Sequence, residues 1–99
     1  MIKHIVMWKL KEFAEGNDKL ENANIIKRRL EDLESEISQI KSIEVGININ
    51  KAESYDVVLC SEFENMEDLD IYQNHPKHIK IVEFVKKTVD KRAAVDYEI

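Results

Sequence analysis

Glycine, proline and cysteine are scarce in this sequence of 99 residues, which contains two Gly, one Pro and one Cys. This scarcity, with 43% hydrophobic residues, excludes a collagen-like chain and argues against disorder and low complexity. With only Gly16 and Gly46, the chain has no glycine-rich phosphate loop, so we expect no nucleotide cofactor. Cys60 has no second cysteine for an internal disulfide, which is typical of a reducing compartment.

Long hydrophobic runs and an excess of basic residues are also absent. No segment approaches the roughly 18 consecutive apolar residues of a membrane span, and the N-terminus lacks the apolar run and cleavage site of a signal peptide. Twenty acidic against fifteen basic residues give a net charge of -5, which opposes binding to nucleic acid or to an anionic membrane. We expect a cytoplasmic protein, complete as written, that binds neither nucleic acid nor membranes.

The length allows a single domain, residues 1–99, because a domain usually takes roughly 100 to 200 residues. A chain this short buries only about 60 to 65% of the surface that its unfolded form exposes. A partner that covers more apolar surface would therefore stabilise it.

The first half of the sequence predicts a strand followed by a helix. Residues 2–10 are rich in β-forming residues and apolar in both alternating sets, so both faces of this strand should be covered. Asp18 and Glu21 have the spacing of a helix-capping pair. The apolar stripe that follows consists of Ile26, Leu30, Leu33, Ile37 and Ile40. This stripe should pack on a sheet.

The second half predicts two strands, a broken helix and a closing strand. Residues 43–49 alternate apolar and polar side chains, whereas residues 56–63 are apolar on both sides. Asn65 can cap a short helix, and Pro76 should end that helix and begin a second one. Residues 92–99 place alternate apolar side chains on one side, as expected of a final strand.

This order of elements, β-α-β-β-α-β, predicts an α+β ferredoxin-like fold with helices on one face of a four-stranded antiparallel sheet. The opposite face, which carries Ile5 and Met7, is then left without cover. We expect this sheet face to pack on its own copy across a two-fold axis, because one patch then covers both chains. The predicted assembly is a homodimer, a dimeric α+β barrel.

Histidine is the residue whose pKa ordinarily lies near neutrality, and the chain has three. His4 shares one side of its strand with Trp8, and His78 lies within the apolar stripe of the last helix, so both should point inward. The kink at Pro76 should turn Tyr72 toward His78. A phenol and an imidazole in an apolar cavity can transfer protons, but two core residues that satisfy each other would give the same pattern.

A metal site has weaker support, because Pro76 interrupts the spacing of His75 and His78 and no third ligand lies at a recognisable position. We expect no metal ion. His75 is better suited to a hydrogen bond that fixes the kink than to catalysis. We also expect a small apolar pocket between helices and sheet, in which Trp8, His75 and Val82 contact a ligand.

Three segments carry a resemblance to a known family. They are the opening Met1–Leu10, the segment Tyr72–His78 with its His-Pro-Lys-His, and the ending Ala93–Tyr97. Together they resemble the stress-responsive A/B barrel domain (Dabb) family over essentially the whole chain. The resemblance implies a dimeric ferredoxin-like barrel, in agreement with the doubly apolar strands.

Members of that family include plant stress proteins without a defined activity and a plant polyketide cyclase that closes a ring by an aldol reaction without a cofactor. The resemblance to the cyclase implies that Tyr72 and His78 carry the proton transfers and that His4 lines the pocket. This chain lacks the cyclase's tyrosine in the first helix, within residues 23–28, and a pocket histidine within residues 56–63. These differences imply a different ligand, or none.

Three functions therefore stay open, and the sequence does not decide whether the protein is an enzyme. The first is cofactor-free acid-base chemistry on a small hydrophobic carbonyl ligand, with His78 as base, Tyr72 as hydrogen-bond donor or proton relay, and His4 as orienting group. The second is a non-catalytic stress or assembly protein whose histidines are structural. The third is a cofactor-independent monooxygenase, for which Trp8 and His4 give thin support.

Overall fold

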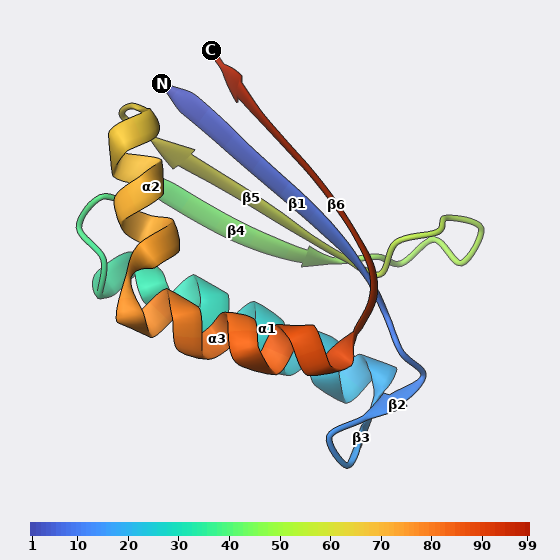
Figure 1. The fold of residues 1–99 in the computed structure, drawn as a ribbon. Coiled ribbons are helices and arrows are strands. Elements are labelled where there is room, and N and C mark those ends of the chain that lie inside the picture. Colours follow the sequence, from blue (N-terminus) through green and yellow to red (C-terminus); the bar gives the residue numbers. More distant parts are fainter.

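The computed structural model describes residues 1–99 and shows a four-stranded antiparallel sheet with helices on one face (Figure 1). The strands, in chain order, are β1 (Ile2–Leu10), β4 (Ser42–Ile47), β5 (Val57–Phe63) and β6 (Val89–Glu98). The helices are α1 (Lys19–Asp32), α2 (Met66–Asn74) and α3 (Pro76–Thr88), and the short 3-10 helix η1 (Leu33–Ser35) follows α1. A small hairpin of β2 (Phe13–Ala14) and β3 (Asn17–Asp18) joins β1 to α1. The predicted ferredoxin-like α+β fold is confirmed.

β1 lies in the middle of the sheet, in which the strands have the spatial order β4-β5-β1-β6. It pairs with β5 on one side and with β6 on the other, so the two ends of the chain lie next to each other (Figure 1). The Ile99 N–H donates to the Met1 carbonyl oxygen at 2.9 Å. Because paired residues of an antiparallel sheet share a face, this register decides which side chains of the first and last strands meet.

The helices bury one apolar layer against the sheet. The α1 N-terminus has the predicted capping box, in which Asp18 accepts from the Glu21 N–H at 2.8 Å and Glu21 accepts from the Asp18 N–H at 3.3 Å. All five residues of the predicted stripe are buried: Ile26, Leu30, Leu33, Ile37 and Ile40. No helix combines the length and the apolar character that a membrane crossing requires.

The regular helix is shorter than the apolar stripe, because the chain tightens after Asp32. The N–H groups of Glu36 and Ile37 both donate to the Leu33 carbonyl oxygen, at 3.0 and 2.9 Å, which turns the chain toward β4. Ile37 and Ile40 are therefore buried from a connecting segment instead of from a helix. The periodicity predicted the burial of these residues, not the length of the helix.

The predicted strand over residues 43–49 is too long at its end. β4 stops at Ile47, and Ile49 is 96% exposed. The side-chain NH2 group of Asn48 donates to the Tyr55 carbonyl oxygen at 2.7 Å, and the side-chain oxygen of Asn48 accepts from the Asn50 N–H at 2.8 Å. These side-chain bonds turn the backbone out of the sheet, which is the usual role of asparagine at a turn.

The sheet face that points away from the helices is apolar along its centre. Ile5 and Met7 of β1 are flanked on both sides by small or apolar residues of β5 and β6. β6 begins at Val89, earlier than predicted. Its residues Ala93, Val95 and Tyr97 lie on this face, where Val95 is 54% exposed. We call this set the outer sheet face: Ile5, Met7, Val58, Cys60, Ala93, Val95 and Tyr97.

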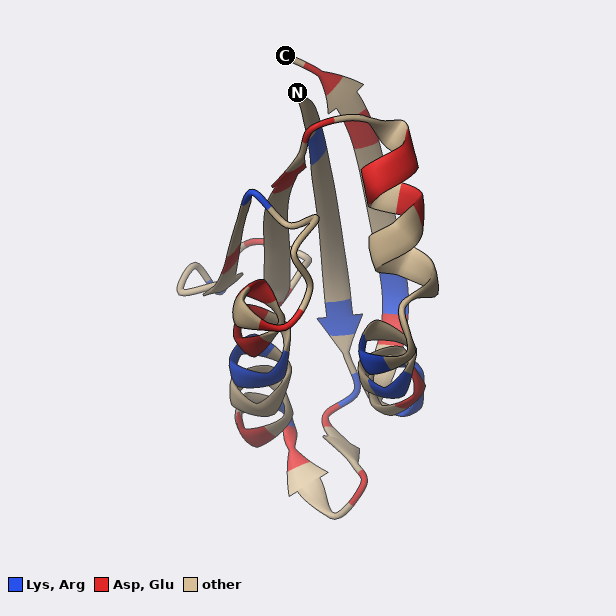
Figure 2. Cartoon of the chain, turned by 90° about the vertical axis from the view of Figure 1, so that its left-hand side faces the viewer, with Lys and Arg blue, Asp and Glu red and all other residues tan.

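Acidic and basic residues are separated on the two consecutive helices α2 and α3 (Figure 2). Glu67 and Asp68 lie in the first turn of α2, and Lys86 and Lys87 lie in the last turn of α3. Both placements complement the helix dipole. The distribution therefore has a local stabilising role, and it also leaves cations near the junction of α3 with β6.

Candidate functional site

A cavity of about 600 Å³ lies between α3 and the inner face of the sheet. Nine of its 15 lining residues are hydrophobic. Four of the site residues predicted from the sequence line this cavity: His4, Trp8, His78 and Val82. The polar side chains that join the two histidines around the cavity are Gln73, Glu83, Lys86 and Arg92. The cavity is therefore an apolar space with a few polar groups, the usual character of a small-molecule site.

Tyr72 is fully buried and lies against the histidines instead of lining the cavity. Its ring centroid is 4.4 Å from that of His78 and 6.4 Å from that of His4. The backbone makes this approach possible, because His75 is extended before Pro76 and starts α3 in a new direction. The structure thus brings Tyr72, His78 and His4 together.

The Tyr72 hydroxyl has no hydrogen-bond partner within the protein. The sequence left open that Tyr72 and His78 satisfy each other, but no hydrogen bond joins them; their rings are in contact and tilted at an interplanar angle of 44°. Burial raises the pKa of Tyr72 above its ordinary value of 10.0, so the phenol stays protonated. This hydroxyl is therefore a proton-bearing donor held in an apolar environment.

His78 is held as a neutral base. Its Nδ1 lies 3.1 Å from the Gln73 carbonyl oxygen, which can only accept, so Nδ1 carries the ring proton and Nε2 has a lone pair. Burial lowers the pKa of His78 below its ordinary value of 6.5; the bond to Gln73 opposes this shift, and the nearby His4 and His75 add to it. Near neutral pH, the ring can therefore accept a proton.

We expect an NMR titration of the His78 ring to give a midpoint below 6.5. A lowered folded-state pKa means that the unfolded chain binds the proton more readily, so His78 contributes stability above the unfolded pKa that is lost as the pH falls through the folded pKa. In acid, the free energy of unfolding should consequently fall less steeply for His78→Gln than for the wild type. A midpoint at or above 6.5 would contradict the burial argument.

His4 is buried, and its Nδ1 is hydrogen bonded to Oδ1 of Asp96. A carboxylate accepts, so the ring presents its Nε2 away from Asp96. The Ser61 hydroxyl donates to the His4 carbonyl oxygen at 3.2 Å and secures the backbone at the same point. Sequence reasoning missed Asp96. The alternation around Val95 signals a polar inner side of the last strand, but only the register of β6 sets Asp96 opposite His4.

His75 does not line the cavity, in contrast to Trp8 and Val82. Its Nδ1 accepts from the Lys77 N–H at 3.1 Å and caps α3. This is the structural hydrogen bond expected at the kink. The ring is turned to the helix N-terminus, which is why it is not available to the cavity.

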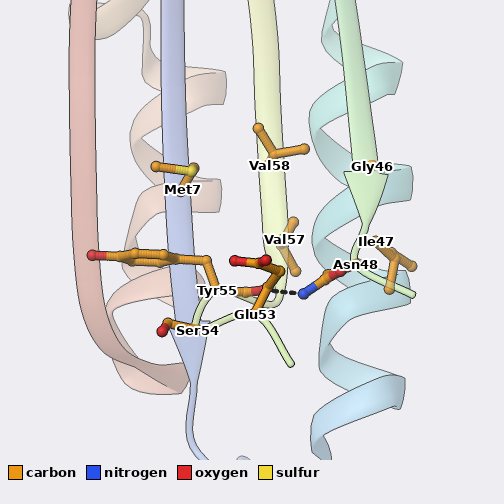
Figure 3. Close-up of a pocket in the computed structure, with 9 residues that line it drawn as sticks. All are labelled: Met7, Gly46, Ile47, Asn48, Glu53, Ser54, Tyr55, Val57 and Val58. Carbon is orange, nitrogen blue, oxygen red and sulfur yellow. Dashed lines mark hydrogen bonds between the residues drawn. The ribbon is translucent and has the colours of Figure 1, made fainter. Parts of the chain in front are cut away.

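A second concavity of about 390 Å³ lies on the opposite side of the sheet, beside the loop that joins β4 to β5 (Figure 3). Met7, Val58 and Gly46 form its floor, and the Tyr55 ring extends across β1 (Figure 3). No histidine lines it. Its position next to the outer sheet face makes it part of an apolar packing surface rather than a site for proton transfer.

The comparisons with known proteins concern the whole chain. The family model described as Stress Responsive A/B Barrel Domain (Dabb) matches residues 2–99. A dimeric protein of unknown function with a ferredoxin-like fold from Bacteroides fragilis NCTC 9343 is 40% identical, with a TM-score of 0.91 over 99% of this chain and 95% of that chain. No curated protein sequence matches.

Two more distant structures share the fold. The protein At3g17210 from Arabidopsis thaliana is 22% identical, with a TM-score of 0.82 over 100% of this chain and 95% of that chain. A hydroxynitrile lyase from Passiflora edulis is 16% identical, with a TM-score of 0.82 over 99% of this chain and 92% of that chain. At these identities the likeness concerns the architecture alone.

Proposed function

Because the chain belongs to the stress-responsive A/B barrel domain family, we propose that it is a homodimer whose cavity binds a small hydrophobic carbonyl compound and moves protons on it without a cofactor. One observation carries the chemistry. A buried, protonated Tyr72 without a partner lies in ring contact with His78, a neutral base that lines the cavity. A proton donor and a proton acceptor side by side in an apolar site are typical of acid-base catalysis.

The homodimer is supported by the outer sheet face. Its apolar side chains are half-buried on β1 and β5, and Val95 and Tyr97 are exposed on β6. Such a patch on a small chain usually marks an interface. The Bacteroides fragilis relative, 40% identical, is described as dimeric. Packing this face on its own copy would leave the cavity under α3 accessible, since the two lie on opposite sides of the sheet.

The proton transfers involve three residues. The His78 Nε2 takes a proton from the carbon next to the carbonyl group, and the electron pair of that C–H bond becomes the carbon-carbon double bond of an enolate. The carbonyl π electrons move to the oxygen, which accepts a hydrogen bond from Tyr72. His4, oriented by Asp96, lies beside this pair. Return of the proton to carbon closes the cycle, so no oxidant or reductant is consumed.

The ligand carbonyl has to reach the Tyr72 hydroxyl, which is buried and does not line the cavity. In this proposal a change of rotamer of the half-buried His78, whose ring contacts that of Tyr72, opens the route. The volume of the cavity favours ligand binding over a purely structural role for the histidines.

The test is exchange of the α-protons of methyl heptyl ketone in deuterated buffer, followed by proton NMR. The wild type should accelerate the exchange, and His78→Gln should lower the rate by about hundredfold or more, because it removes the base. His75→Asn is the matched control, since asparagine also caps helices and position 75 lies outside the cavity. A wild-type rate equal to that of buffer, or an equal loss in the control, would rule out the proposal.

A further inference from the structure

The cavity is elongated, and its floor shows this most clearly. On β1, His4 and Trp8 both line it, and they are four residues apart. At about 3.3 Å per strand residue, their positions are separated by about 13 Å. The register with β6 places Asp96 opposite His4 at one end and Arg92 opposite Trp8 at the other. The proton-transfer groups and Arg92 therefore lie at opposite ends.

Along the wall formed by α3, an imidazole and a cation also lie at opposite ends. His78 lies near its beginning and Lys86 near its end, and both line the cavity. Eight residues of helix at about 1.5 Å per residue separate them by about 12 Å. Two independent elements thus place a cation far from the imidazoles, and the apolar side chains of Val82 and Val85 lie between the two ends.

The cations at this far end are not neutralised by the protein. Several other lysines form ion pairs with acidic residues, whereas neither Arg92 nor Lys86 does. Glu83 is the only carboxylate that lines the cavity, and it pairs with neither of them. Lys86 lies in the last turn of α3, where its charge already complements the helix dipole. Arg92 lies on a strand, so its charge does not complement a helix dipole.

We propose that the ligand is an elongated carbonyl compound with a carboxylate at its far end, which Arg92 binds. The inference rests on the proposed function of this same cavity and names the class of its ligand. A guanidinium presents two parallel donors that match a carboxylate, which makes arginine the better partner than Lys86. The apolar middle of the cavity holds the chain of the ligand and excludes water from it, while the carbonyl group lies at His78.

The test compares binding of three ketones by the fluorescence of Trp8, the only tryptophan of the chain, which lines the cavity next to Arg92. The ketones are methyl heptyl ketone, the same ketone with a carboxylate on the end of its heptyl chain, and levulinate, which is too short to span the cavity. The carboxylated ketone should bind about tenfold more tightly than methyl heptyl ketone.

Arg92→Gln should abolish this advantage, because methyl heptyl ketone has no carboxylate for Arg92 to bind. Levulinate should bind less tightly to the wild type than the long carboxylated ketone does, because it cannot reach Arg92 and His78 at once. Lys87→Gln is the matched control for loss of a positive charge, because Lys87 follows Lys86 on α3 but does not line the cavity. It should leave the carboxylate advantage in place. Added salt should reduce the advantage in the wild type, since the contact is ionic and near solvent.

The failures of the two proposals are distinguishable. Equal affinity for the two long ketones, or equal weakening of both by Arg92→Gln, would overturn the inference while the binding of methyl heptyl ketone upholds the cavity as a site. Loss of the advantage in Lys86→Gln instead of Arg92→Gln would overturn the assignment of Arg92. Absence of binding by every ketone would overturn the proposed function as well.

Discussion

Replacing Met7 by Asp should raise the dissociation constant of the dimer by about hundredfold or more. Met7 lies on the outer sheet face between Val58 and Ala93, close to its centre. In the proposed homodimer this position is desolvated, and an unpaired carboxylate there costs several kcal/mol. About 3 kcal/mol corresponds to about a hundredfold change in affinity. Sedimentation velocity over a dilution series should show the wild type near twice 11.6 kDa and the variant near 11.6 kDa.

Ile49→Asp is the matched control for this prediction. It makes a similar exchange of an apolar residue for Asp at a position that is 96% exposed and outside the sheet, so association should be unchanged. Circular dichroism should show a folded chain for both variants. A wild type that sediments as a stable monomer, or a Met7→Asp protein that associates as strongly as the wild type, would rule out this interface.

Tyr72→Phe should lower the rate of α-proton exchange by about hundredfold without loss of stability. The change removes one hydroxyl and almost no volume, and the hydroxyl has no partner within the protein. An unsatisfied buried polar group costs about 1–3 kcal/mol, so the free energy of unfolding should stay equal or rise. The rate should fall because the oxygen of the enolate loses its hydrogen-bond donor, an effect of about 10² to 10³ in comparable sites.

Measurements of urea unfolding and of exchange on the same samples separate catalysis from structure. Tyr55→Phe is the control, because Tyr55 lies at the concavity on the other side of the sheet (Figure 3) and should affect neither quantity. If Tyr72→Phe instead lowers the free energy of unfolding by about 1–3 kcal/mol and leaves the exchange rate unchanged, the hydroxyl is structural.

The sequence by itself determined the features that depend on nearby residues. The capping pair of Asp18 and Glu21 set the start of α1, and Pro76 set the break between α2 and α3. Apolar residues in both alternating sets of residues 2–10 and 56–63 indicated that the sheet is apolar on both faces. Capping, proline geometry and side-chain alternation act over a few residues, so they can be read before the chain is folded. The approach of Tyr72 to His78 follows from the same short segment.

Only the tertiary structure decided which distant residues meet. The position of Asp96 beside His4, and of Arg92 at the other end of the cavity, depends on the register of β6 against β1, two strands from opposite ends of the chain. A shift of two residues would keep both side chains on the inner face but move them along the sheet, and the local alternation of the strand permits it. The unpartnered Tyr72 hydroxyl is likewise a result of packing, since it depends on every group that surrounds the ring. Register and packing are set by the whole core at once, which is why the site could be predicted only in part.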